Sequence, residues 1–317
     1  MKAWEMLEEF PLQIKGAEVE SISLEGYKGI VFSGMGGSGI VGDLAKILLE
    51  KYGIPIPVFS LRGYTLPPYV REGWLVFCIS YSGNTEETLS VAKSALERNI
   101  KPICISSGGK LMELALKENL LHFSLPEGYP PRYALGYMLS IVLSLLDVKD
   151  PLGSCSSFLQ EKKEAIKEEA KKIAQSFEGY VPVVYATQTL EPVAFRWKTQ
   201  INENAKTLCY TAVLPELHHN EVVGLDNPIT RNVCSFLLMF DPEEHPRVIK
   251  RVQITEEVLR DFGIVPKVIK GEGESFLHRV LYLVYLGDWV SLYLSELYKY
   301  DPLPVRTIDL IKNKLSV

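Results

Sequence analysis

Short apolar runs that alternate with helical patterns are the feature that most constrains how this chain can fold. In the first half of the chain, strands are expected at residues 29–33, 57–59, 74–80, 102–106 and 122–125. Helical patterns lie between them, at residues 39–51, 86–98 and 111–119. The runs are continuously apolar, which is typical of strands buried on both faces of a parallel sheet. The first half is therefore predicted to be a doubly wound α/β domain.

The second half follows a similar plan after a turn-rich stretch, DPLGS, at residues 150–154. A charged helix is expected at residues 161–176, and strands are expected near residues 181–186, 207–213, 233–240 and 265–269. Because Pro and Gly cluster at breaks between elements, we place a domain boundary near residue 150. The prediction is thus two doubly wound α/β domains, residues 1–150 and 151–317, each with a parallel sheet flanked by helices.

Composition excludes several classes of protein. The net charge is −5, so no basic surface would attract nucleic acid. The most apolar stretch, residues 276–297, carries too many charged or titratable side chains for a lipid-facing helix. These side chains are His278, Arg279, Asp288 and Glu296. The five cysteines form no CxxC pair and no signal peptide is evident, which predicts a cytoplasmic protein with reduced thiols.

Two loops rich in Gly and Ser each lead from an expected strand into an expected helix. The first reads SGMGGSG at residues 33–39, and the second reads SYSGNT at residues 80–85. Both follow strands of a parallel sheet, and ligands of open α/β folds bind at the carboxyl edge of such a sheet. Backbone N–H groups at a helix start favour an anion, and glycine lets the backbone approach a ligand closely.

Hydroxyl groups in these loops add further hydrogen-bond donors. The residues expected to bind a phosphate monoester are Gly37, Ser38, Ser80, Ser82 and Thr85. Ser and Thr before a helix often act only as N-caps. Two such loops at the ends of buried strands in one domain nevertheless favour a binding site, and the set of donors requires no metal ion.

The first loop also matches the dinucleotide fingerprint GxGxxG, through Gly34, Gly36 and Gly39. That fingerprint requires an acidic residue about 20 positions later, at the end of the second strand. The expected second strand runs into Ser60, Leu61 and Arg62, without a carboxylate. This argues against NAD, whereas Arg62 leaves an NADP interpretation open. We expect no cofactor.

These two loops resemble the signature of sugar isomerase (SIS) domains, which are flavodoxin-like modules that bind phosphosugars. Three elements in the second half narrow the resemblance: NENAK at residues 202–206, PELHHN at residues 215–220 and IDLIK at residues 308–312. In combination, and over nearly the whole chain, they resemble the archaeal-type bifunctional phosphoglucose/phosphomannose isomerases. The resemblance implies reversible isomerisation of glucose 6-phosphate, and of mannose 6-phosphate, to fructose 6-phosphate through a cis-enediol.

The resemblance also implies roles for four residues. Glu203 matches the base that moves a proton between C1 and C2, a task for which one carboxylate suffices. His219 and Lys312 match the groups that open the sugar ring, and His titrates near neutral pH. Arg132 matches an arginine that stabilises the enediolate charge. In the family the matching His comes from the neighbouring subunit, which implies a homodimer with a shared active site.

One position departs from the pattern of the family. Some members carry Thr seven residues before the terminal Lys, where it shapes the space around C2, but here that position is Val305, with Thr307 nearby. Dual specificity is therefore less secure than isomerase activity.

His218 and His219 suggest a metal ligand pair, but neither HExxH nor a His/Cys cluster completes a shell, so no metal is expected.

Two other functions fit part of the pattern. SIS domains also occur in non-catalytic regulators that bind phosphosugars, but such proteins usually add a basic DNA-binding module, for which this chain has no room. Amidotransferring sugar-phosphate synthases need a glutaminase domain with an N-terminal Cys, whereas the first two residues here are Met and Lys. We therefore expect an isomerase, with the regulator as the alternative.

Overall fold

The structure, a computed structural model, describes residues 2–148 and 150–315. The chain divides into two compact units. Unit 1 comprises residues 1–161 and 273–281, and unit 2 comprises residues 162–272 and 282–317. The predicted turn at residues 150–154 is wrong, because these residues belong to the long helix α7 (Asp150–Phe177). Pro is tolerated in the first turn of a helix because its missing N–H has no partner there.

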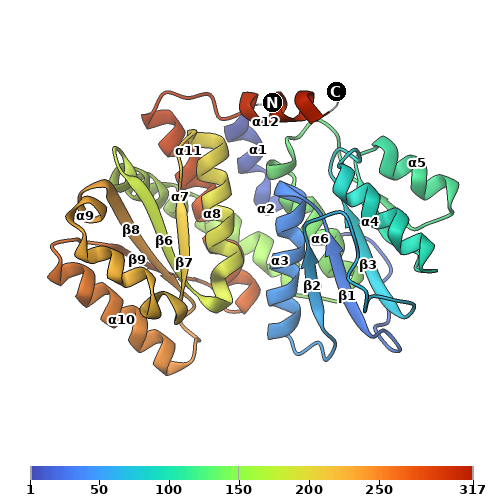
Figure 1. Ribbon diagram of the computed structural model, residues 1–317, viewed down its shortest axis with the longest axis horizontal. Helices are drawn as coiled ribbons and strands as arrows, with labels where there is room; N and C mark the ends of the chain where they lie inside the picture. Colours follow the sequence, from blue (N-terminus) through green and yellow to red (C-terminus); the bar gives the residue numbers. More distant parts are fainter. Residues whose placement is uncertain (1, 149, 316–317) are drawn as a thin grey trace. The chain divides into compact units, whose positions relative to one another are not determined.

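Unit 1 is built around a five-stranded sheet with the order β2-β1-β3-β4-β5. The neighbouring strands β2, β1 and β3 are labelled in Figure 1. The strands are β1 (Gly29–Ser33), β2 (Val58–Leu61), β3 (Trp74–Ile79), β4 (Ile103–Ser106) and β5 (His122–Ser124). Every neighbouring pair is parallel. The prediction of a parallel sheet in the first half is confirmed, and each predicted strand overlaps an observed one.

Helices cover both faces of this sheet. They are α1 (Ala3–Glu8), α2 (Phe10–Gln13), α3 (Gly36–Lys51), α4 (Glu86–Glu97), α5 (Gly109–Lys117), the 3₁₀ helix η1 (Pro131–Tyr133) and α6 (Leu135–Leu145). Val76 and Cys104 of the sheet share one buried cluster with Val91 of α4 and Leu111 of α5. On the other face, α3 approaches β1 closely at Gly42, and α6 packs against α3. This is the doubly wound arrangement.

Unit 2 contains a four-stranded parallel sheet with the order β7-β6-β8-β9. Its strands are β6 (Val181–Thr187), β7 (Tyr210–Leu214), β8 (Cys234–Phe240) and β9 (Lys267–Lys270). The other elements are η2 (Gln188–Leu190), α8 (Glu191–Ala205), η3 (Glu216–His219), η4 (Glu221–Asp226), α9 (Pro228–Val233), α10 (Pro246–Asp261) and α12 (Arg306–Leu315). Helix α11 (Phe276–Leu297) has residues 276–281 in unit 1 and the rest in unit 2. The prediction of a second α/β sheet in the second half is also confirmed.

A buried ion pair fixes α8 to α11. Arg196 Nε and Nη2 donate to the two carboxylate oxygens of Asp288, at 3.0 and 2.8 Å. Both side chains are almost completely buried, at 1% and 2% exposure. Further along the two helices, Asn204 Nδ2 donates to Ser291 Oγ at 2.9 Å. The C-terminal end of α8 is therefore held in a defined position.

Of the described helices, one, α11, is long and apolar enough to cross a membrane by length and composition alone. In the structure, 83% of its most apolar window is buried. Burial to this extent is typical of a core helix, and it agrees with the charged residues that the sequence places along this stretch.

The five cysteines are free thiols, and four of them are buried. Cys78 of β3 lies beside Cys104 of β4 in the sheet register. Burial raises the pKa of Cys104, Cys155 and Cys209 to about 12, and it also raises the pKa of Cys78. These thiols are therefore protonated at neutral pH.

Candidate active site

The two predicted phosphate-binding loops lie side by side in unit 1. They follow β1 and β3, which are neighbouring parallel strands, so both loops emerge at the same edge of the sheet. The chain leaves β1 for β2 on one side of it and later returns to β3 on the other side. In doubly wound sheets, ligands bind at such a switch point, at the carboxyl ends of the strands.

Hydrogen bonds join the two loops and use the predicted hydroxyl groups. The backbone N–H of Tyr81 donates to Ser38 Oγ at 3.0 Å. Ser80 Oγ and Thr85 Oγ1 are 2.9 Å apart and share a hydrogen bond. Ser38 and Ser80 are buried, whereas Ser82 is exposed at the rim. The structure thus brings the predicted serines and the threonine together at one edge of the sheet.

The starts of α3 and α4 are not capped in the ordinary way. The N-cap residues are Met35 and Thr85, and neither side chain accepts a hydrogen bond from its helix. The hydroxyl of Thr85 instead pairs with Ser80. The two helix N-termini therefore retain the partial positive charge that favours an anion. Helix α3 begins at Gly36, earlier than the expected residue 39.

Glycine is required at two points of these loops. A Cβ on Gly37 would lie 2.8 Å from the backbone N of Arg132, so this loop packs directly on the backbone of η1. Gly83 has a φ of +68°, and a Cβ there would overlap the carbonyl oxygen of Gly108. A side chain at either position would displace the backbone. We call the two loops together, residues 33–39 and 80–85, the cradle.

A third loop, between β4 and α5, supports the cradle and was missed by sequence reasoning. Ser107 donates to the carbonyl of Tyr81 through its backbone N–H at 2.8 Å and through its hydroxyl at 2.7 Å. The N–H of Leu111 donates to the carbonyl of Gly83 at 2.9 Å. The sequence SSGG at residues 106–109 lies between an expected strand and an expected helix, and this pattern could have indicated the third loop.

Arg132 lies in unit 1 beside the cradle. It belongs to η1, and α6 begins only at Leu135. Its side chain is buried, with 4% exposure, and the guanidinium carbon lies 5.0 Å from the centre of the Tyr133 ring. A buried cation whose backbone contacts Gly37 adds positive charge near the loop.

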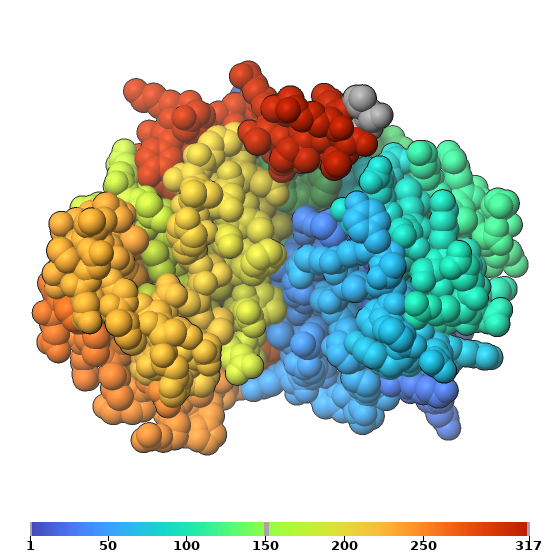
Figure 2. All heavy atoms as spheres, viewed as in Figure 1, coloured from blue at the N-terminus to red at the C-terminus, as the bar shows by residue number. Residues whose placement is uncertain are grey.

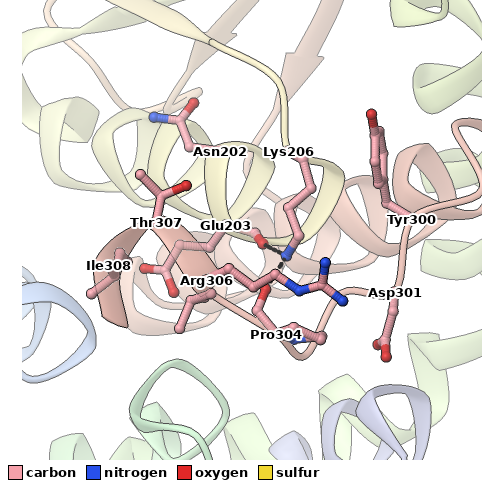
Figure 3. Close-up of a pocket in the computed structure, with 10 residues that line it drawn as sticks. Asn202, Glu203, Lys206, Tyr300, Asp301, Pro304, Arg306, Thr307 and Ile308 are labelled. Carbon is pink, nitrogen blue, oxygen red and sulfur yellow. Dashed lines mark hydrogen bonds between the residues drawn. The ribbon is translucent and has the colours of Figure 1, made fainter. Parts of the chain in front are cut away.

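Glu203 lies in unit 2, near the C-terminal end of α8, where it is half-buried. It lines a cavity of about 520 Å³ (Figure 3). Two stretches form the lining: residues 202, 203 and 206 at the end of α8, and residues 300, 301 and 304–308 of the C-terminal segment. Val305, which stands at the position where some relatives carry a Thr that shapes the space around C2, lines this cavity, and so does the nearby Thr307.

A further residue of this cavity, Lys206, was quoted in the sequence motif but given no role. It follows α8 with a left-handed backbone, φ 56°. Its ammonium group donates to the carbonyl oxygens of Glu203, Pro302 and Pro304. Figure 3 shows the bonds to Glu203 and Pro304. The distances to Pro302 and Pro304 are 3.2 and 2.7 Å. No sequence pattern indicates these contacts, since the acceptors are backbone atoms.

The structure does not bring all of the predicted residues together. Among the described residues, Lys312 and His219 do not line the cavity of Glu203. Lys312 is exposed on α12, which lies at the surface in Figure 2, and His219 is exposed at the end of η3. Arg132 and the cradle belong to unit 1, whereas Glu203, His219 and Lys312 belong to unit 2.

His218, the neighbour of His219, makes structural contacts. Arg251 Nη1 lies 3.0 Å from its Nδ1, and Thr255 Oγ1 lies 2.8 Å from its Nε2. Burial lowers the pKa of His218, and the positive charges of Arg251 and His219 lower that pKa further. A neutral His218 accepts from Arg251 at Nδ1 and donates to Thr255 from Nε2, which attaches η3 to α10. Within the described residues, no group of three or more His, Cys, Asp or Glu side chains suits a metal ion.

Known proteins resemble this chain along its whole length. Residues 23–140 match the SIS domain model, and residues 166–315 match the model of the bacterial phospho-glucose isomerase C-terminal SIS domain. A bifunctional phosphoglucose/phosphomannose isomerase of Aquifex aeolicus is 52% identical over 99% of this chain and 98% of its own. The chain belongs to this family.

Further comparisons agree with this family. A relative of the same name from Caldicellulosiruptor bescii is 38% identical over 99% of this chain and 95% of its own. A hypothetical protein of Thermus thermophilus has a solved structure with a TM-score of 0.76, at 16% identity, covering 99% of this chain and 87% of its own. That likeness shows the fold, whereas the two relatives show a family of sugar-phosphate isomerases.

Proposed function

We propose that this protein interconverts glucose 6-phosphate and fructose 6-phosphate, and mannose 6-phosphate and fructose 6-phosphate. The observation that carries the proposal is the position of Glu203, a half-buried carboxylate that lines a cavity at the end of a fixed helix. Relatives over the full length of the chain are named for both activities. With reduced thiols, the enzyme would act in the cytoplasm.

The cradle would bind the substrate phosphate. Two helix N-termini and the hydroxyls of Ser38, Ser80, Ser82 and Thr85 offer donors to a dianion, and the exposed position of Ser82 suits contact with a ligand from solvent. Neutral donors of this kind explain how a chain with a net charge of −5 binds an anion. In this proposal, unit 1 mainly determines substrate affinity.

Glu203 would move the proton. As a carboxylate it removes the proton from C2 of the open-chain aldose, the electrons of that bond form the C1–C2 double bond, and the negative charge goes to O1. A proton passes from O2 to O1 within the cis-enediol, and the same carboxyl group returns its proton to C1 as the C2 carbonyl forms. One base on one face of the enediol can perform both transfers. Arg132 would stabilise the negative oxygen of the enediolate, as an oxyanion-hole group does.

His219 and Lys312 would open the sugar ring before this transfer, by exchanging protons with the ring oxygen and the anomeric hydroxyl. By the family resemblance, His219 acts in the active site of the neighbouring subunit, so its position outside the cavity of its own chain is expected. The proposal therefore includes a homodimer in which each active site takes one histidine from the partner.

Acceptance of both epimers depends on the space around C2. Val305 lines the cavity where some relatives carry Thr, and it offers methyl groups but no hydroxyl. An apolar wall does not hydrogen-bond a C2 hydroxyl in either orientation. Val305 therefore does not by itself support the acceptance of mannose 6-phosphate, and the assay on both aldose phosphates decides between one substrate and two.

The proposal is tested by assaying the purified chain on both aldose phosphates in the presence of EDTA. Glu203→Gln should lower kcat by about 10²- to 10⁴-fold, the usual effect of losing a general base, while phosphosugar binding persists. Glu257→Gln, at an exposed position on α10, serves as the matched control and should keep normal turnover. Near-normal turnover by the Glu203 variant would contradict the mechanism.

The same experiment addresses the regulator alternative. A wild-type chain that binds fructose 6-phosphate tightly but turns over neither aldose phosphate would be a phosphosugar-binding regulator. Failure to consume glutamine would exclude the amidotransferring synthase.

A further inference from the structure

One side of the cavity of Glu203 is lined by a segment that has little regular structure of its own. Residues 301–305 connect α11 to α12 and contain Pro302 and Pro304, neither of which has an N–H to donate. The segment supplies Asp301, Pro304 and Val305 to the cavity lining. The hydrogen bonds that hold it against α8 therefore determine the shape of the cavity.

Lys206 provides such hydrogen bonds from one atom. Its Nζ donates to the carbonyl oxygens of Pro302 and Pro304 in the segment and to the carbonyl oxygen of Glu203 in α8. The bonds to Pro304 and Glu203 are visible in Figure 3. An ammonium group has three donors, and three backbone oxygens accept from this one. One side chain thus joins the two stretches that line the cavity, and we call this set of contacts the Lys206 clasp.

The backbone of Lys206 turns away from α8 directly after the end of the helix. Its φ of 56° lies in the left-handed region, where helix ends usually carry Gly or Asn. A lysine adopts this conformation at a steric cost that Gly would avoid. The carbonyl of Glu203 lies in the last turn of α8, where backbone oxygens lack partners within the helix, and a cation is favoured there.

We propose that Lys206 is a positioning residue that sets the discrimination between C2 epimers of the substrate. By holding the carbonyls of Pro302 and Pro304, it fixes Val305 in the wall of the cavity that Glu203 also lines. The room beside C2 then depends on the clasp as well as on the side chain at residue 305. This inference rests on the proposed function for the identity of its substrates.

Two variants and one control test the clasp. Lys206→Met keeps the length of the side chain but removes the donors and the charge, whereas Lys206→Arg keeps both. Lys299→Met is the matched control, because Lys299 has the same left-handed backbone at the end of a helix, with φ 58°, and does not line the cavity. For each chain, hydrogen exchange of residues 301–311 and the discrimination between glucose 6-phosphate and mannose 6-phosphate are measured.

Lys206→Met should accelerate exchange in residues 301–311. It should also change the ratio of kcat/KM for the two epimers at least about fivefold, the effect of losing one or two hydrogen bonds. Lys206→Arg should restore part of both effects, since its planar group reaches fewer of the three oxygens. Lys299→Met should change neither measurement.

Two results would overturn the inference. Unchanged exchange in Lys206→Met would show that the clasp does not hold the segment. Faster exchange with an unchanged epimer ratio would show that the clasp serves stability alone. Absence of turnover in the wild type would instead contradict the proposed function. The ratio of the dissociation constants for glucose 6-phosphate and mannose 6-phosphate would then replace the kinetic ratio and decide the inference.

Discussion

The two units hold their candidate residues in different ways. In unit 1 the cradle is formed by two loops that each follow a strand directly, and neighbouring parallel strands place them side by side. In unit 2 the cavity of Glu203 lies between the end of α8 and a segment about 100 residues later in the chain. The side chain of Lys206 joins these two stretches by hydrogen bonds. One site is built by sheet topology and the other by a long-range contact.

This difference suggests that the two sites contribute to different steps, substrate binding and turnover, and mutations can test this. A site built from backbone groups binds a ligand of fixed charge and tolerates few side chains in its loops. A site held by side chains can be adjusted by single substitutions. We therefore expect changes in the cradle to affect substrate affinity, and changes in unit 2 to affect turnover, specificity or the stability of the helix that carries Glu203.

The largest effect is expected for Gly83→Ala in unit 1. The new Cβ would overlap the carbonyl oxygen of Gly108, and the backbone has a left-handed φ of +68°. We expect a loss of stability of more than about 4 kcal/mol, together with loss of phosphosugar binding. Urea unfolding and titration calorimetry would measure both.

Gly63→Ala is the control, because a Cβ at that position meets nothing within 4 Å. If Gly83→Ala retained wild-type stability and binding, the packing of the third loop against the cradle would be wrong.

A smaller but still large effect is expected for Asp288→Ala in unit 2. The variant removes the carboxylate that pairs with the buried Arg196, which should lower the free energy of unfolding by about 3–5 kcal/mol. Denaturant unfolding measures this loss. The exposed pair Arg260–Glu256 provides the control, and Glu256→Ala should cost less than about 1 kcal/mol. Equal losses in the two variants would contradict the role of burial.

Thr85→Val should have a moderate effect that is confined to affinity. The substitution keeps the shape of the side chain but removes the hydroxyl that pairs with Ser80. We expect KM to rise about tenfold with little change in kcat, the effect of about one hydrogen bond. Steady-state kinetics measures both, and Ser90→Ala, later on the same helix, is the control. A fall in kcat without a change in KM would reverse the proposed division of labour.

The smallest effect is a dependence of stability on pH. Burial lowers the pKa of His122, His218 and His278 below the ordinary value of 6.5. Between the folded and unfolded pKa values the unfolded chain binds more protons, so the free energy of unfolding decreases as the pH falls below about 6.5. Thermal unfolding from pH 7.5 to 5 would show this slope. His218→Gln should reduce it, and an unchanged slope would contradict the assignment of His218 as neutral.

Sequence reasoning succeeded where the relevant contacts are local. A continuous apolar run followed by Gly and a helix predicts a buried strand and the loop after it, and the two loops of the cradle were located in this way. Their binding of a phosphate stays a prediction. The stretch at residues 150–154 was misjudged because Pro and Gly also occur in the first turn of a helix, which nothing in the local pattern distinguishes from a loop.

The cavity of Glu203 was less accessible to prediction. The resemblance pointed to Glu203, but the contacts of Lys206 involve the backbone oxygens of Pro302 and Pro304, for which residue types carry no signal. The roles of His219 and Lys312 stay predictions, because neither lines this cavity within the described part of the chain.

Each unit contains a buried thiol whose alkylation can report how often that unit unfolds locally. Because a thiol with a pKa of about 12 holds almost no thiolate at neutral pH, Cys104 in unit 1 and Cys209 in unit 2 should resist alkylation while the chain is folded. The rate at which each is labelled would then measure how often its surroundings open to solvent. A ligand that binds the cradle should slow labelling of Cys104 more than labelling of Cys209.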